Sequence, residues 1–168
     1  MNRRSFLKRF GSVAAFAAAS AHTCLAHFAP ASGPLRPSPI NSRYFVDGSG
    51  RPVFLTGAHT WANFQEIGSA PIPTFDWEGY LNMMMANNHN FMRFWAWQQS
   101  AWAPWTPTKI LFEPTLYLRT GPGTALDGGP KFDLTQFNPA YFPRMKERLI
   151  ECRNRNIYCA VQLFQSFA

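Results

Sequence analysis

Seven side chains suited to ligand recognition follow three apolar segments of this sequence, at the points where the segments end. They are His59, Trp61 and Asn63 after the first segment, Arg93, Trp95 and Trp97 after the second, and Gln165 after the third. Amide, imidazole and guanidinium groups form hydrogen bonds with sugar hydroxyls, and flat indole rings stack on the apolar faces of pyranose rings. The residue types therefore predict a site that binds carbohydrate.

Some of these residues, and two others, also have a structural interpretation. Arg93 can pair with a carboxylate at the edge of the core, and His59 can be a hydrogen-bonded structural histidine. We expect one of Trp95 and Trp97 to face the site and the other to pack inward. Trp77 belongs to the core of a predicted helix, and His89 lies at a helix C-terminus, where a cation is favoured. Trp77 and His89 are therefore left out of the predicted site.

The elements that must position the site alternate between strands and helices. Segments 44–46 and 52–55 flank the turn sequence DGSG and predict a hairpin, whose second strand continues to Gly57. Apolar spacing predicts a helix over 75–87, with Thr74 as N-cap, followed by a buried strand over 90–95. Segment 96–138 is rich in proline and glycine and is expected to be irregular. A second helix then begins at Asn138-Pro139, and a third strand covers 157–164.

This order predicts a parallel sheet with helical crossovers, because buried strands alternate with helices. Three strands and two helices cannot cover both faces of such a sheet, and a complete (β/α)₈ barrel takes about 250 residues. The predicted fold class is therefore α/β, as the N-terminal part of a (β/α)₈ TIM barrel of about three strands, preceded by a β-hairpin. The predicted domain covers 43–168, after a proline-rich linker over 30–42.

Residues 1–29 are typical of an export signal. A basic start with two adjacent arginines, the extension Phe-Leu-Lys and a short alanine-rich apolar run match a twin-arginine signal peptide. The apolar run is shorter than the roughly 20 residues that span a bilayer. We therefore expect a bacterial protein that engages the twin-arginine export machinery, reaches the periplasm or the exterior, and has no stable membrane anchor.

The composition narrows the class of partner. The formal charge is +7, but four of the basic residues lie in the signal, which leaves 12 basic against 9 acidic residues. No basic cluster interleaves with the aromatic residues, so nucleic acid is not an expected partner. No zinc-type pairing and no dinucleotide fingerprint occurs, and we expect no metal and no cofactor. Cys152 and Cys159 flank a predicted helix-to-strand turn and form either two buried thiols or a disulfide.

Four linked segments resemble those of a known enzyme family. The sequences are NSRYFVDGSGRPVFLTGAHTWANFQE, NHNFMRFWAW, TGPGTALDGGPKFDLTQFNPAYFPRMKERL and IYCAVQLFQ. Together they resemble exported bacterial glycoside hydrolases with a cellulase-like TIM barrel, from the clan of retaining (β/α)₈ glycosidases. The resemblance implies that Arg93 orients the nucleophilic carboxylate, and that His59 and Trp61 contact the substrate.

The same resemblance implies two catalytic glutamates that this sequence does not contain. Such enzymes carry an Asn-Glu pair after the fourth strand and a second Glu after the seventh, and no Asn-Glu occurs here. A retaining mechanism needs two carboxyl groups about 5–5.5 Å apart. The expected function is therefore that of a glycoside hydrolase-like protein acting on polysaccharide or oligosaccharide, inactive as this fragment.

Two other functions remain open at this point. A non-catalytic carbohydrate-binding module would keep the tryptophan-rich mouth without the acids. A redox protein exported by the twin-arginine route would need a cofactor site, and the sequence offers no Cys/His cluster for one.

Overall fold

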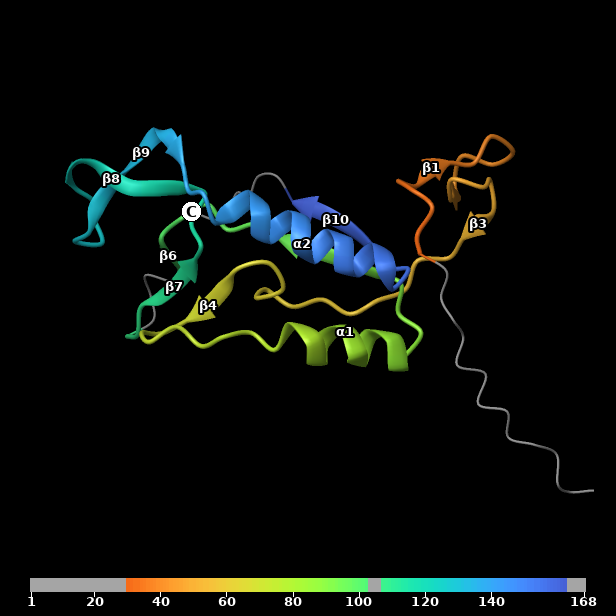
Figure 1. Ribbon diagram of the computed structural model, residues 1–168, viewed down its shortest axis with the longest axis horizontal. Helices are drawn as coiled ribbons and strands as arrows, with labels where there is room; N and C mark the ends of the chain where they lie inside the picture. Colours follow the sequence, from red (N-terminus) through yellow and green to blue (C-terminus); the bar gives the residue numbers. More distant parts are fainter. Residues whose placement is uncertain (1–29, 103–106, 163–168) are drawn as a thin grey trace, which may run out of the picture.

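The computed structural model describes residues 30–102 and 107–162, with the side chain of Trp102 excepted (Figure 1). The predicted signal peptide over 1–29 and the predicted site residue Gln165 lie outside these residues. The elements follow in the order β1 (Arg36–Pro37), β2 (Phe45–Val46), β3 (Pro52–Val53), β4 (Glu66–Gly68), α1 (Trp77–Ala86), β5 (Phe91–Trp95), β6 (Ala101–Trp102), β7 (Ile110–Glu113), β8 (Tyr117–Thr124), β9 (Pro130–Phe137), α2 (Tyr141–Asn154) and β10 (Tyr158–Gln162). No helix among the described residues is long and apolar enough to cross a membrane.

The predicted fold class is wrong. In the described part of the chain the strands form four small sheets, of which three are antiparallel, and the two helices account for 19% of the residues. The sheet orders are β1-β2-β3, β4-β7-β6, β8-β9 and β10-β5. Of these, the pair β5–β10 is parallel, in register from Phe91 opposite Tyr158 to Trp95 opposite Gln162. The fold is therefore a set of small antiparallel sheets around one parallel pair, and it is not part of a TIM barrel.

The first predicted barrel strand explains much of this error. The second strand of the hairpin was expected to run from 52 on to Gly57 as the first strand of the barrel, but β3 ends at Val53. Phe54 is 85% exposed, so the apolar run does not lie inside a sheet. The chain passes the start of β5 instead, where the Thr56 carbonyl accepts hydrogen bonds from the amides of Asn90 and Phe91 at 2.8 and 3.0 Å.

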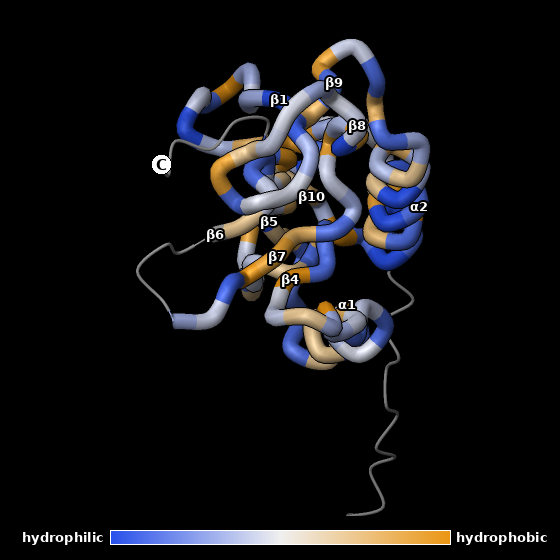
Figure 2. The backbone as a smooth tube through the Cα atoms, turned by 90° about the vertical axis from the view of Figure 1, so that its left-hand side faces the viewer, coloured by the Kyte–Doolittle hydropathy of each residue, from blue (hydrophilic) through white to orange (hydrophobic). Residues whose placement is uncertain are grey.

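The segment expected to be irregular contains four strands, β6 to β9, which belong to two antiparallel sheets. β7 is central in its sheet, pairing with β4 and β6, and its apolar residues stand out in Figure 2. β8 and β9 form a hairpin at the end of the molecule opposite the β1–β3 sheet (Figure 1). The turn between them uses Gly128, which adopts a positive φ of 84°. The hairpin therefore forms despite the proline and glycine in this segment, with an irregular register between Tyr117 and Thr124.

The core lies on one face of the parallel pair. Met92 and Phe94 of β5 are buried against Leu81 and Met84 of α1 and against Cys152 of α2. Both predicted helices are confirmed, although Asp76 rather than Thr74 caps α1, and α2 begins at Tyr141. Because alternate residues of a strand point to opposite faces, Arg93 and Ala160 lie on the other face. They are paired in register and both are exposed, so this second face is open at the position of that pair.

Cys152 and Cys159 are free thiols within this core. Cys152 is fully buried at the end of α2, and Cys159 lies next to it on β10. A hydrogen bond with the Cys152 thiol, together with burial, raises the pKa of Cys159. Because the thiolate is the reactive form of cysteine, the raised pKa makes the Cys159 thiol less reactive in the folded protein.

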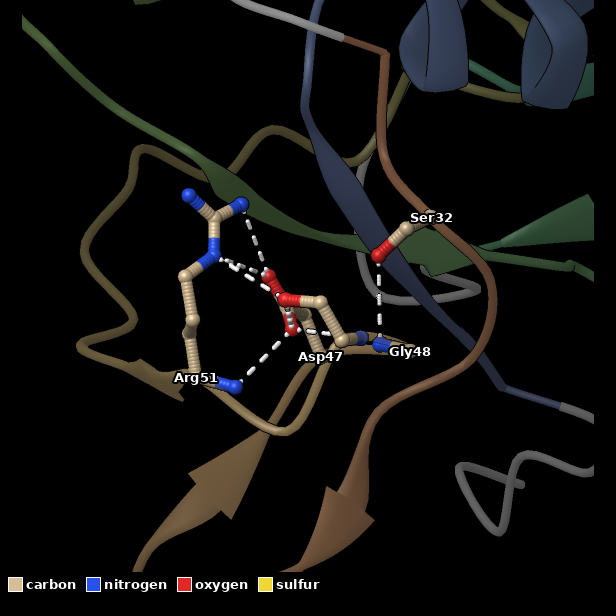
Figure 3. A network of polar contacts seen from close by, with 5 residues as sticks. Ser32, Asp47, Gly48 and Arg51 are labelled. Carbon is tan, nitrogen blue, oxygen red and sulfur yellow. Dashed lines mark hydrogen bonds and ion pairs between the residues drawn. The ribbon is translucent and has the colours of Figure 1, made fainter.

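The β1–β3 sheet is organised by the carboxylate of Asp47 in the predicted hairpin turn (Figure 3). Asp47 Oδ1 accepts hydrogen bonds from the Ser49 amide and hydroxyl at 2.8 and 2.6 Å and from the Arg51 amide at 3.1 Å. The Arg51 guanidinium pairs with Asp47 Oδ2 at 3.1 Å. Ser32 Oγ accepts a hydrogen bond from the Gly48 amide at 3.1 Å, which joins the preceding segment to the turn. The predicted hairpin is confirmed.

We expect the hairpin turn to lose order in acid. These hydrogen bonds, led by the one from the Ser49 hydroxyl, lower the pKa of Asp47 from 3.8 to about 2. A carboxyl group whose pKa is lower in the folded state stabilises the protein above its unfolded pKa, and this contribution is lost as the pH falls from about 4 to 2. The protection of the Ser49 and Arg51 amides against exchange, relative to the intrinsic rate at each pH, should therefore fall over that interval. Asp47→Asn should accelerate this exchange at neutral pH, whereas Asp76→Asn should not, because asparagine caps a helix as well as aspartate does.

Candidate functional site

Four of the predicted site residues come together as one group of rings. The aromatic cluster, as we call it, consists of His59, Trp61, Trp95 and Trp97. The His59 and Trp95 ring centroids are 5.4 Å apart, those of Trp61 and Trp97 are 6.0 Å apart, and those of Trp95 and Trp97 are 5.5 Å apart. Trp97 Nε1 donates a hydrogen bond to the Trp61 carbonyl at 3.1 Å, which ties the two segments together.

The three tryptophan rings of the cluster differ in their exposure to solvent. Trp61 is 44% exposed, Trp95 is 8% exposed and Trp97 is 1% exposed. Trp97 stacks on Phe112 of β7, with ring centroids 4.6 Å apart, so the deepest ring rests on the β4-β7-β6 sheet. We expected one of Trp95 and Trp97 to face the site and the other to pack inward. Both rings are buried in one cluster with Phe112, and which of them faces a ligand stays a prediction.

Two buried amides hold the segment that carries Trp95 and Trp97. Asn63 Oδ1 accepts a hydrogen bond from the Trp95 amide at 3.3 Å, and Asn63 Nδ2 donates to the Arg93 carbonyl. Gln65 Oε1 accepts from the Trp97 amide at 2.5 Å, and Gln65 Nε2 donates to the Trp97 carbonyl at 3.0 Å. Asn63 and Gln65 are fully buried. Their side chains therefore take the place of a neighbouring strand along residues 93–97.

This arrangement puts Asn63 beneath the cluster. Its amide is bonded to backbone, so the structure gives Asn63 a positioning role. Gln65 has the same role and was not among the predicted site residues. The signal that could have found it is the spacing: Asn63 and Gln65 are two residues apart, as are Trp95 and Trp97.

The loop under the cluster is anchored to α2 by charge. Arg148 is buried, and its Nη1 donates to the carbonyls of Asn63 and Phe64 at 2.6 and 3.2 Å. Its guanidinium lies 4.7 Å from the Trp77 ring centroid, and Glu66 lies 3.6 Å from its Nη2. Burial, with a smaller effect of Arg144, lowers the pKa of Arg148 to about 10. Glu66 also forms an ion pair with Arg144, so this carboxylate is committed to structure.

Two shallow hollows border the exposed side of the cluster. One, of about 410 Å³, is lined by His59, Thr60, Trp61, Ala62 and Ile67. The other, of about 290 Å³, is lined by Gly57, Ala58, His59, Phe91, Met92 and Arg93. His59 belongs to both, and partial burial and the charge of Arg93 lower its pKa below the ordinary value. Neither lining includes a carboxylate, so the residues around the hollows supply no acid–base pair.

Arg93 completes the site. Its guanidinium carbon lies 5.6 Å from the Trp95 ring centroid, on the open face of the β5–β10 pair. His59, Trp61, Arg93, Trp95 and Trp97 are thus brought together as predicted residues, Asn63 lies beneath them, and Gln165 is outside the described chain.

Comparisons with protein-family models, with curated proteins and with solved structures found no match to this chain. The resemblance to glycoside hydrolases and the expected export therefore stay predictions.

Proposed function

We propose that the aromatic cluster binds a saccharide, with Trp61 as the ring on which a sugar stacks. The observation that carries the proposal is an exposed indole held against two buried ones. Trp61 is 44% exposed, and its ring centroid lies 6.5 and 6.0 Å from those of Trp95 and Trp97. An aromatic side chain whose position is already fixed loses little conformational entropy when a ligand packs on it.

Polar groups at the edges of the cluster support the same function. The His59 imidazole and the Arg93 guanidinium lie beside the rings and line the hollows. Sugar-binding sites combine such directional hydrogen-bonding groups with an apolar platform, as small-molecule sites do in general. Pockets lined by several aromatic rings and few polar groups would suit an apolar ligand, whereas the edge of this cluster carries both kinds of group.

The proposed activity is binding rather than hydrolysis. A retaining glycosidase requires two carboxyl groups about 5–5.5 Å apart. The two hollows are lined by no carboxylate, and Glu66 is held in ion pairs with Arg144 and Arg148.

The test is a titration of the full chain with a panel of neutral and acidic oligosaccharides. Binding is measured by tryptophan fluorescence and by calorimetry. We expect a change in tryptophan emission that saturates with at least one saccharide. Trp61→Ala should weaken that binding by about tenfold or more, because truncating a central aromatic anchor typically costs about 2 kcal/mol.

The matched control is Tyr44→Ala. Tyr44 is 60% exposed and lies next to β2, so this variant removes an exposed aromatic ring outside the cluster. It should bind like the unaltered protein. Saccharide binding that survives Trp61→Ala unchanged, in a variant whose far-ultraviolet circular dichroism is unaltered, would contradict the proposal.

A further inference from the structure

The guanidinium of Arg93 is a charge without a counterion in the described part of the chain. Its neighbour is the Trp95 ring, and no ion pair or hydrogen bond of its side chain occurs there. Other arginines are committed to carboxylates: Arg119 pairs with Asp127, and Arg155 with Glu78. Arg93 is nevertheless exposed on the open face of the parallel strands, directly beside the aromatic cluster.

The surroundings of Arg93 favour a negative ligand. The hollow of about 290 Å³ that Arg93 lines is otherwise lined by Phe91 and Met92 of β5, by Gly57 and Ala58, and by His59. No carboxylate lines this hollow or the neighbouring one, so a bound anion would meet no like charge from the lining residues. An arginine fork matches the geometry of a carboxylate and forms two parallel charge-assisted hydrogen bonds with it.

We propose that the saccharide bound by the aromatic cluster contains a uronic acid, with its carboxylate on Arg93 and a sugar ring against Trp61. This inference rests on the proposed function and makes it more specific. A neutral sugar presents only hydroxyl oxygens to the Arg93 guanidinium, whereas a uronate also presents a planar, negatively charged carboxylate. Trp95 neighbours both contacts, since its ring centroid is 6.5 Å from that of Trp61 and 5.6 Å from the Arg93 guanidinium carbon.

The experiment compares uronate oligosaccharides with their methyl esters, which keep the sugar rings and remove the charge. Trisaccharides of galacturonate, glucuronate and mannuronate are titrated into the full chain beside the three esters. We expect at least one acid to bind about tenfold more tightly than its ester at low salt, because a charge-assisted hydrogen bond is roughly twice as strong as a neutral one. The difference should shrink as salt is added, since exposed charges are screened.

Substitutions assign the effect to Arg93. Arg93→Gln should reduce binding of the acid about tenfold more than it reduces binding of the ester, because only the acid loses a charge-assisted contact. Arg93→Lys should retain part of the preference, because lysine keeps the charge without the fork. The matched control is Arg43→Gln, which removes an exposed arginine outside the site and the same net charge. It should leave both ligands unaffected. Acetate and benzoate should not compete, because they carry the carboxylate without the sugar ring.

The outcomes separate this inference from the proposed function. Equal binding of acid and ester, abolished by Trp61→Ala and unchanged by Arg93→Gln, would overturn the uronate inference and leave saccharide binding in place. Binding of acetate and benzoate as tight as that of the uronates would show a simple anion site and overturn it as well. Absence of binding by every acid, ester and neutral saccharide would overturn both.

Discussion

Replacing Asn63 with leucine is expected to lower the free energy of unfolding by about 3 kcal/mol, because each buried polar group left unpaired costs roughly 1–3 kcal/mol. Leucine has nearly the shape of asparagine but offers no hydrogen bond. The Trp95 amide and the Arg93 carbonyl would both lose the side chain that now pairs with them. The loss falls on the segment that carries the aromatic cluster, so saccharide binding should weaken together with stability.

Urea unfolding gives the change in free energy, and near-ultraviolet circular dichroism reports whether the packed indoles lose their fixed arrangement. The matched control is Asn82→Leu on the exposed side of α1. It makes the same chemical change without burying an unpaired group, and surface substitutions usually stay within about 0.5 kcal/mol. If Asn63→Leu were as stable as Asn82→Leu, the two buried hydrogen bonds would not be holding the segment.

The local parts of this fold were predictable because their signals are local. Apolar residues at helical spacing place Leu81 and Met84 on the inner side of α1, and the structure buries both. The turn sequence at 47–50 predicts the hairpin, because the Asp47 side chain bonds to Ser49 and Gly50 supplies a positive φ, and both signals are local. The parallel pairing of 91–95 with 158–162 follows from two apolar strands joined through a helix.

The pairing of distant strands was not predictable in the same way. β4 pairs with β7 from Glu66 opposite Glu113 to Gly68 opposite Leu111, across more than forty intervening residues and a helix. Nothing in either short segment marks the other as its partner. The segment 52–57 shows the opposite error, since an apolar run suggested the first barrel strand while Phe54 is exposed.

For the site, the sequence predicted which residue types gather, but not the role that each residue has. Tryptophan, histidine and arginine at 59–97 do gather in space, as their chemistry suggested. The roles of Asn63 and Gln65 depend on which backbone groups lie opposite them, and that is a property of the fold. Arg148 was not identified either, because a buried arginine on an otherwise ordinary helix is recognised by the carbonyls it reaches on a distant loop.

Gly57→Ala is expected to destabilise the protein by about 3 kcal/mol, at the upper end of the range for overpacking a close contact. A Cβ at position 57 would lie 1.6 Å from the Phe91 carbonyl oxygen, and the obstruction is backbone that cannot rotate away. The segment leading to His59 would have to move away from β5. The hydrogen bonds from Asn90 and Phe91 to the Thr56 carbonyl would be lost with that movement.

The matched control is Gly79→Ala in α1, which adds the same methyl group where the obstruction is a side chain and not backbone. Its Cβ would meet the Asp76 carboxylate, which is the end of a side chain and can rotate. Alanine gains about 1 kcal/mol over glycine within a helix, and displacing the Asp76 cap costs about as much, so the net change should be small. Thermal unfolding of both variants measures the difference. Because Gly57 and His59 line the same hollow, Gly57→Ala should also weaken saccharide binding, and Gly79→Ala should not. Equal stability of the two variants would mean that the chain can bypass the contact with Phe91 and that His59 is not positioned by it.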